Sequence, residues 1–301
     1  MRAFTHIAII GTGLIGSSVA RAVREKLPES RLSGFDRDPA TRQRAEELGL
    51  FDAVHSDYAP LAEADLVLLC VPVGAMAAVG RDIAPHIGAD AIISDVGSCK
   101  ASVLNDLRSA LPDATIIPAH PVAGTEKSGP DAGFASLFEG RWCIITPDDN
   151  TDESDIARLE AFWSALGANV ERMDAEHHDL VLAVTSHLPH LIAYTIVGTA
   201  SDLESVTRSE VIKYSAGGFR DFTRIAASDP VMWRDVFLSN REAVLDMLQR
   251  FTEDLTALQR AIRRDEGDTL EDLFTRTRAI RRGIIDEGQD VAEPDFGRDH
   301  G

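Results

Sequence analysis

The sequence is poor in cysteine and in basic residues, and both shortages narrow its possible functions. Only three cysteines, Cys70, Cys99 and Cys143, occur in 301 residues, and they lie far apart. An odd, scattered set forms neither a disulfide framework nor a metal-ligand cluster, which suits a reducing compartment. Lys and Arg number 30 against 49 Asp and Glu, so the formal net charge is −19. Because an acidic chain repels phosphate backbones and anionic lipid surfaces, we expect neither a nucleic-acid nor a membrane partner.

A targeting signal is also missing from the pattern. The opening MRAFTHIAII runs directly into a glycine motif, with no small-residue cleavage site behind it, so we expect a cytoplasmic protein. Residues 180–201 form a stretch of 22 residues without acidic or basic side chains, long enough to span a bilayer. His187, Pro189 and His190 lie near its middle, where a bilayer would make them costly. We therefore predict a helix buried inside a soluble protein and kinked at Pro189.

Short apolar runs alternate with helical patterns in the first half of the chain, as in βαβ units. This pattern predicts an α/β Rossmann-type dinucleotide-binding domain over residues 1–173. Strands are expected at 6–10, 31–35, 66–71, 91–94, 115–118, 142–146 and 168–172, and helices at 14–26, from 39 onward, at 102–111 and at 152–166.

Helical periodicity dominates after about Asp174. We predict an all-α domain over residues 174–286 and an acidic flexible tail over 287–301, where five acids accompany one arginine. Apolar residues recur at helical spacing and predict one helix that buries a single face: Val236, Val244, Leu248, Phe251 and Leu255.

A glycine-rich turn gives the clearest chemical signal. Gly11, Gly13 and Gly16 form GxGxxG between a predicted strand and a predicted helix. In such a turn the first glycine makes the bend, the second lets backbone approach a pyrophosphate, and the third allows close helix–strand packing. Leu14 and Ile15 open the helix, whose N-terminal amides and dipole favour phosphate. The turn therefore predicts dinucleotide binding.

The next strand supplies a carboxylate for the adenosine ribose. Asp36 lies 20 residues beyond Gly16 and ends that strand. Because a carboxylate repels a 2′-phosphate, NAD is favoured over NADP, although Arg37 could accept that phosphate and leaves dual use open. Val71 and Pro72 follow a further buried strand and are expected to contact the cofactor.

Two more predicted strands end in polar residues. Ser98 and Lys100 follow one strand, and His120 follows another. Since ligands bind beyond the carboxyl ends of parallel strands, these groups are expected near the nicotinamide. For His120 the alternative is a solvated loop histidine, but its place after a buried strand favours a functional role.

The second half offers two pairs of candidate residues. His187 and His190 are three residues apart, but without HExxH or a thiolate cluster we expect no metal. They could instead be two core histidines. Arg220 and Arg224 are four apart, so on a helix they would share a face and could hold a carboxylate. A surface salt bridge to Asp221 is the alternative.

Taken together, the motifs resemble the prephenate/arogenate (cyclohexadienyl) dehydrogenase family of tyrosine biosynthesis. The resemblance spans about residues 5–240 in the family's order, and Val122 stands where many members have Met. It is carried by GTGLIGSS, VPV, DVGSCK, HPVAGTEKSG, HHD, SHLPH and AGGFRDFTRIAASDP.

The resemblance implies NAD-dependent oxidative decarboxylation of prephenate to 4-hydroxyphenylpyruvate, or of arogenate to tyrosine. His120 would act as the base at the ring hydroxyl, and Ser98 would lie in hydrogen-bond reach of hydroxyl and cofactor. It implies that the helical domain binds substrate and forms a homodimer. The substrate-binding residues that it implies are His190, Arg224 for a carboxylate, and Glu126, Arg220 and Asp221 as an ionic gate.

Other readings remain open. Another two-domain reductase, of the β-hydroxyacid dehydrogenase or imine reductase type, would usually rely on a lysine in the helical domain. Lys213 is the only lysine after Lys127, and it lacks a matching motif. An NAD-binding sensor without turnover is the non-enzymatic alternative. The sequence separates neither prephenate from arogenate nor a tyrosine-inhibited enzyme from an uninhibited one.

Overall fold

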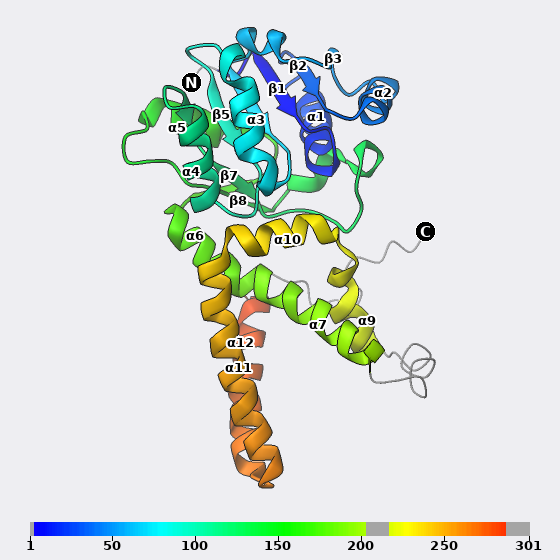
Figure 1. The fold of residues 1–301 in the computed structure, drawn as a ribbon, viewed down its shortest axis with the longest axis vertical. Helices are drawn as coiled ribbons and strands as arrows, with labels where there is room; N and C mark the ends of the chain where they lie inside the picture. Colours follow the sequence, from blue (N-terminus) through cyan, green and yellow to red (C-terminus); the bar gives the residue numbers. More distant parts are fainter. Residues whose placement is uncertain (1–2, 203–216, 287–301) are drawn as a thin grey trace. The chain divides into compact units, whose positions relative to one another are not determined.

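A computed structural model describes residues 3–202 and 217–286 of the chain (Figure 1). The chain falls into two compact units, residues 1–245 and 246–301. All of the predicted site residues belong to the first unit.

A parallel sheet of six strands, in the order β3-β2-β1-β4-β5-β6, forms the centre of the first unit. Every residue of β1 and β4 is buried, as expected for strands covered on both faces. The strand order reverses between β1 and β4, and α/β proteins bind ligands at such a switch point. The strands are β1 (His6–Ile10), β2 (Arg31–Phe35), β3 (Ala53–His55), β4 (Leu66–Leu69), β5 (Ile92–Asp95) and β6 (Thr115–Ile116).

Helices cover both faces of this sheet (Figure 1). Because side chains alternate along a strand, Ile7 and Ile9 of β1 enter one hydrophobic cluster, whereas Ala8 and Ile10 enter the other. The α-helices are α1 (Leu14–Lys26), α2 (Pro39–Glu47), α3 (Met76–Ile83), α4 (Ala101–Ala110) and α5 (Glu153–Ala165). Short 3-10 turns lie at Ala59–Glu63, Val73–Ala75, Ala84–His86, Pro130–Ala132 and Ala135–Phe138.

A second sheet of three strands holds His120, and this corrects the sequence prediction. In it β7 (Ala119–Pro121) pairs antiparallel with β8 (Trp142–Ile145), which pairs parallel with β9 (Asn169–Arg172). The predicted strand at 115–118 ends at Ile116, and His120 lies on a strand of its own rather than in a loop. Proline is confined mainly to edge strands, and β7, which contains Pro121, is an edge of its sheet.

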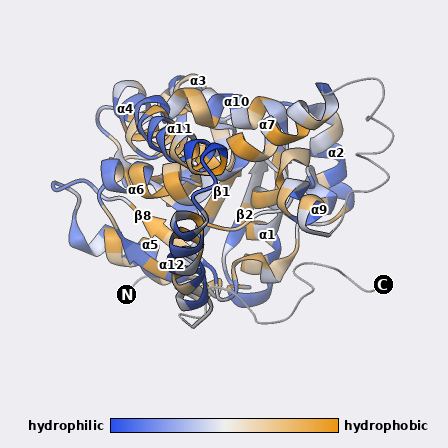
Figure 2. Ribbon diagram, turned by 90° about the horizontal axis from the view of Figure 1, so that it is seen from below, coloured by the Kyte–Doolittle hydropathy of each residue, from blue (hydrophilic) through white to orange (hydrophobic). Residues whose placement is uncertain are grey.

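The predicted buried helix at 180–201 is only partly correct. Residues Ala175–Asp202 form one continuous helical segment that is long and apolar enough to cross a membrane, but only 22% of its most apolar window is buried. A soluble protein's core helix would be mostly buried. Orange residues along α7 show this apolar character in Figure 2. The segment comprises α6 (Ala175–Leu182), a π-helical turn (Ala183–His187) and α7 (Leu188–Asp202), and it exposes Leu180, Val184, Ile196 and Val197.

The π-helical turn stands immediately before Pro189, where the sequence predicted a kink. Proline has no N–H for a bond to the residue four positions back, and local π geometry accommodates such a break. After the undescribed residues the chain continues through α9 (Gly217–Thr223), a 3-10 turn (Arg224–Ala227) and α10 (Pro230–Ser239).

The single amphipathic helix predicted from Val236 to Leu255 is wrong. Helix α10 ends at Ser239, and Asn240 has non-helical backbone angles before α11 (Arg241–Arg263) begins. Val236 and Val244 are buried, but Leu255 is 48% exposed, so the apolar face of α11 is not covered along its length. Helix α12 (Gly267–Asp286) follows a turn in which Asp265 has a φ of 53°.

Candidate active site

The glycine turn at the end of β1 is shaped for a dinucleotide. A Cβ on Gly11, whose φ is +94°, would lie 2.3 Å from the Cys70 carbonyl oxygen, and a Cβ on Gly16 would lie 2.0 Å from the Gly11 oxygen. By contrast, a Cβ on Gly13 would meet no atom within 4 Å. Gly13 is also the N-cap of α1 and makes no side-chain capping bond. The structure therefore packs two of the glycines tightly and leaves open the one beside the helix N-terminus, as phosphate binding requires.

Asp36 is fixed beside this turn. Its Oδ2 accepts hydrogen bonds from the backbone N–H of Thr12 at 2.9 Å and from the Thr12 hydroxyl at 3.2 Å, and its Oδ1 accepts one from the Asp38 N–H at 3.0 Å. Each carboxylate oxygen has two lone pairs, so acceptor capacity remains for a ribose. Arg37 beside it is exposed. Val71 lies next to Gly11, where the ends of β1 and β4 meet, and Pro72 follows it.

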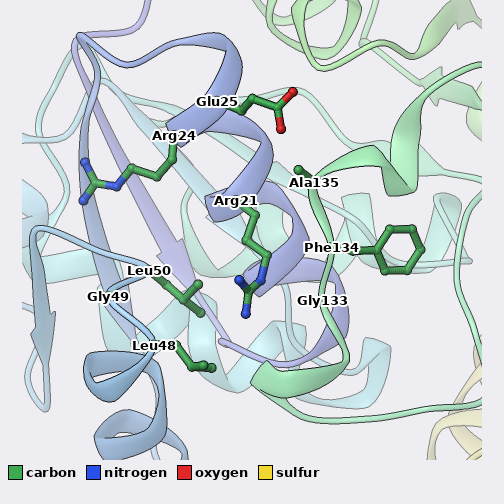
Figure 3. Close-up of a pocket in the computed structure, with 9 residues that line it drawn as sticks. All are labelled: Arg21, Arg24, Glu25, Leu48, Gly49, Leu50, Gly133, Phe134 and Ala135. Carbon is green, nitrogen blue, oxygen red and sulfur yellow. The ribbon is translucent and has the colours of Figure 1, made fainter.

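A surface hollow of about 570 Å³ is lined by Arg21, Arg24 and Glu25 of α1 (Figure 3). In Figure 3 the Arg21 side chain extends from α1 toward the loop at Leu48, whereas Phe134 points away from that loop. The hollow contains none of the predicted cofactor-binding or catalytic residues.

A buried ion pair joins the ends of β5 and β7. The Lys100 ammonium donates to Asp95 Oδ2 at 2.5 Å and to the Ala119 carbonyl at 2.6 Å, and both side chains are completely buried. Burial raises the pKa of Asp95, although Lys100 opposes that rise. Since Ala119 precedes His120, this pair holds the strand that carries the imidazole. It also holds the loop that carries Ser98, which is half-buried.

His120 belongs to a buried chain of hydrogen bonds. Its Nδ1 lies 2.9 Å from His178 Nε2, and His178 Nδ1 lies 2.8 Å from Asp179 Oδ1. Both of the additional residues come from α6. Their role could not be predicted from the sequence, although they lie together in its HHD motif.

The surroundings hold His120 in its neutral form. Burial lowers the pKa of His120 well below its ordinary value, and the nearby His178, Lys100 and His187 lower it further. Burial also lowers the pKa of His178, against the opposing effect of its bond to Asp179. A neutral imidazole can accept a proton near pH 7, so the site provides a base without needing an altered solvent pH.

The SHLPH histidines lie in different environments. His190 stacks on Trp233 with ring centroids 3.7 Å apart, and its Nδ1 donates to the Ser186 carbonyl at 2.8 Å. Its Nε2 is therefore left as an acceptor for another group. His187 is fully buried and lies 3.1 Å from Asn240, and burial lowers its pKa to about 4.

Arg224 pairs with Glu126, and not with Asp221, the alternative partner that the sequence offered. Its Nη1 lies 3.0 Å from Glu126 Oε2, across 98 residues of sequence. Helix α9 ends at Thr223, so Arg220 and Arg224 do not share one regular α-helix. Arg220 and Asp221 are exposed on α9. Burial lowers the pKa of His190, and the charge of Arg224 lowers it further.

Within residues 3–202 and 217–286, no group of three histidine, cysteine or acidic side chains is arranged to hold a metal ion. Lys213 lies outside the residues that the structure describes.

These features define the class of the protein: a two-domain dehydrogenase that uses NAD. The open glycine turn and Asp36 fit the cofactor, and the neutral His120 fits removal of a hydroxyl proton.

Comparison with known proteins identifies the family. Residues 19–172 match the model of the prephenate dehydrogenase nucleotide-binding domain, and residues 174–276 match that of the prephenate dehydrogenase dimerization domain. The chain therefore belongs to the prephenate dehydrogenase family. The cyclohexadienyl dehydrogenase of Zymomonas mobilis is 48% identical, over 94% of this chain and 97% of that protein. The prephenate dehydrogenase of Bacillus subtilis is 32% identical, over 92% and 76%.

Solved structures agree with this assignment. The prephenate dehydrogenase of Aquifex aeolicus, crystallised with hydroxyphenyl propionate and NAD+, matches with a TM-score of 0.88 and 33% identity, over 94% of this chain and 99% of that chain. The arogenate dehydrogenase of Synechocystis matches with a TM-score of 0.78 and 26% identity, over 93% and 99%.

Proposed function

We propose that this enzyme oxidatively decarboxylates prephenate, arogenate or both, in tyrosine biosynthesis. The observation that carries this proposal is the neutral His120 on β7, bonded to His178 and preceded by Ala119, whose carbonyl accepts a hydrogen bond from Lys100. Membership of the family and the substrates in its members' names support the same reaction.

Overall, the substrate loses a hydride and carbon dioxide. Its hydroxyl proton leaves during hydride removal and returns to the same oxygen as the phenol forms. The glycine turn and Asp36 would hold NAD+, which would supply the hydride acceptor for the ring carbon that carries the hydroxyl group. His120 takes the hydroxyl proton as the new carbonyl or phenol oxygen develops, and Ser98 hydrogen-bonds the same oxygen. Carbon dioxide leaves from the opposite ring carbon, and aromatisation drives the step.

The substrate's carboxylates need cationic partners in a chain of net charge −19. Arg224 binds one of them as a charge-assisted pair, and His190 contacts the substrate from the helical domain. Glu126, Arg220 and Asp221 form the ionic gate at the pocket. The Arg224–Glu126 bond supports this assignment, because it already joins the two domains at that point.

The direct test is NADH formation with prephenate and with arogenate, each supplied with NAD+ and with NADP+, in the presence and absence of tyrosine. Turnover of either substrate supports the proposal. Binding of NADH without turnover of either one would instead favour a sensor or a reductase with another substrate.

We infer two functional domains, residues 1–173 for the cofactor and 174–286 for substrate binding and dimerisation. The family matches at 19–172 and 174–276 support this division, and the acidic residues 287–301 lie outside the described part of the chain. The expected cytoplasmic location stays a prediction.

A homodimer accounts for the apolar surface that one chain leaves open. Ile196 and Val197 on α7 are 39% and 40% exposed, and Ile262 and Ile280 on α11 and α12 are 63% and 61% exposed. Single apolar residues on a surface are ordinary, but repeated exposure along a long helix marks that helix as an interaction surface. The dimerization-domain match supports a second copy of this chain as the partner.

Introducing charge at Leu255 and Ile262, the exposed apolar residues of α11, should weaken the dimer. The double variant Leu255→Asp/Ile262→Asp is expected to sediment as a monomer at concentrations where the wild type is a dimer, because two carboxylates would have to be buried. Thr256→Asp is the matched control on an exposed polar position of α11. Analytical ultracentrifugation measures the result, and a double variant that remains dimeric would move the interface elsewhere.

Replacing Asp36 should shift cofactor preference. Asp36→Ser removes ribose hydrogen bonds and the charge that repels a 2′-phosphate, so the ratio of kcat/KM for NAD+ over NADP+ should fall about tenfold or more. Asp38→Ser is the control, since serine retains the N-cap of α2. A wild type that already prefers NADP+ would contradict this role for Asp36.

A further inference from the structure

We propose that His178 and Asp179 are positioning residues for His120, which they hold in the tautomer that leaves Nε2 free to accept the substrate's proton. This inference rests on the proposed role of His120, and it goes beyond that role by explaining what orients the base.

The direction of the hydrogen bonds follows from chemistry. An ionised carboxylate only accepts, so His178 Nδ1, 2.8 Å from Asp179 Oδ1, must carry a hydrogen. A neutral imidazole has one N–H, so His178 Nε2 is then an acceptor. His120 Nδ1, 2.9 Å away, must donate to it, which leaves His120 Nε2 without a hydrogen.

The carboxylate that begins this chain is itself firmly held. Asp179 Oδ1 accepts from the Lys100 backbone N–H at 2.7 Å, and Oδ2 accepts from the Ala101 N–H at 3.0 Å. Those amides open α4, whose N-terminal dipole favours a negative charge. The Asn240 side chain donates to the Asp179 carbonyl at 2.7 Å. Two backbone N–H groups at the start of α4 therefore fix the carboxylate, and the Asn240 bond fixes the backbone of the same residue.

Burial leaves His178 as the hydrogen-bond partner of His120 Nδ1. His178 is completely buried and His120 is 8% exposed, so water has little room to offer His120 Nδ1 another partner. Lys100 and Asp95, on the loop and strand packed against this group, are bonded to each other and to Ala119. His187, whose pKa burial lowers to about 4, has its Nδ1 3.1 Å from the Asn240 side chain. Among the described residues, His178 is therefore the hydrogen-bond partner of His120 Nδ1.

The neutral state of His120 makes this control necessary. A protonated imidazole would donate from both nitrogens, but a neutral one has two tautomers, of which one presents an N–H to the substrate and cannot accept a proton. Because the pKa of His120 is far below neutrality, the choice of tautomer decides whether the base works.

Two substitutions at His178 separate positioning from packing. In His178→Gln the amide can donate to Asp179 and accept from His120, so kcat should stay within about fivefold of wild type. In His178→Leu both bonds are lost, and kcat should fall about 10- to 100-fold, a part of what a positioned base contributes. His177→Gln, on the exposed neighbour, should leave kcat unchanged. Equal losses in the Gln and Leu variants at equal melting temperature would overturn the proposal.

Asp179→Asn tests the direction of the chain. An asparagine amide that donates to His178 Nδ1 would force the opposite tautomer on His178 and then on His120, so kcat should fall while the Kd for NADH stays near wild type. Nitrogen NMR of ¹⁵N-histidine protein, with His120 assigned by comparison with His120→Asn, reads the tautomer directly without substrate. The wild type should show protonated Nδ1 and bare Nε2 on His120, and Asp179→Asn should show the reverse.

The NMR result also separates the two proposals. A bare Nε2 in the wild type supports positioning even if prephenate and arogenate both fail as substrates, which would overturn only the proposed function. A protonated Nε2 on His120 in the wild type would overturn the positioning role, whatever the substrate. If Asp179→Asn does not fold, the wild-type tautomer and the Gln and Leu variants of His178 still decide the outcome.

Discussion

Replacing His120 with asparagine is expected to lower kcat by about 10²–10⁴-fold, the usual contribution of a positioned acid–base group. Asparagine is the matched substitution, because its amide can still donate to His178 Nε2 and fill much of the same buried space. It cannot take a proton from the substrate's hydroxyl. The variant should therefore fold and bind NADH as the wild type does, with the defect confined to turnover.

Melting temperature, NADH affinity and kcat on one preparation distinguish this result from misfolding. His177→Asn serves as control, since His177 is exposed on the same helix as His178. Near-normal kcat in folded His120→Asn would show that another group removes the proton.

The pH dependence of the wild type follows from the same residue. Burial and the neighbouring His178 and Lys100 lower the pKa of His120, so protonation sets in only well below the ordinary histidine value of about 6.5. A base is active above its pKa. On its acid side, kcat/KM should therefore stay level from neutral pH to below 6.5 and fall only in more acidic solution.

The substitution Arg224→Ala is expected to raise KM for the substrate about 10- to 150-fold. A charge-assisted hydrogen bond is worth about 1.5–3 kcal/mol, and about 1.4 kcal/mol corresponds to tenfold. An effect on KM alone would indicate the side-chain carboxylate, which stays on the product. A loss of kcat as well would indicate the ring carboxylate, which departs as carbon dioxide. Arg224→Lys should rescue only partly, because an ammonium lacks the planar fork.

The alternative role of Arg224 is a structural ion pair with Glu126, and the variant Glu126→Gln tests it. Arg224 and Glu126 side chains are 58% and 37% exposed, and an ion pair so exposed contributes about 0–1 kcal/mol to stability. If Arg224 does no more than form this pair, Glu126→Gln and Arg224→Ala should both leave kcat/KM intact. If Arg224 binds substrate, Arg224→Ala should lower kcat/KM more than Glu126→Gln does, because glutamine removes only the partner of the guanidinium. Normal kinetics in Arg224→Ala would remove Arg224 from the site.

The sequence alone determined the elements around the cofactor. The predicted bounds of β1, α1 and β2, at His6–Ile10, Leu14–Lys26 and Arg31–Phe35, agree with the structure. Glycines at turns and the spacing of apolar residues are local signals, because each is contained within a short stretch of sequence. The family motifs likewise contained the side chains of the site, because identity and order are properties of the chain itself.

Only the tertiary structure decided how those side chains are paired. His120 meets His178 across 58 residues and Arg224 meets Glu126 across 98, and no spacing rule predicts partners at such separations. The nearest acid, Asp221, was the local alternative for Arg224. His120 itself lies on an edge strand, because pairing with β8 overrides the turn signal of its flanking prolines.

Burial was the other property that sequence could not supply. The apolar segment 180–201 predicted a helix inside the protein, yet Val184 and Val197 on it are 48% and 40% exposed. An apolar sequence predicts that a helix is buried, but it does not show whether the same chain or another chain buries it. That depends on which elements the fold brings against the helix, and in the described part of this chain they leave much of it open.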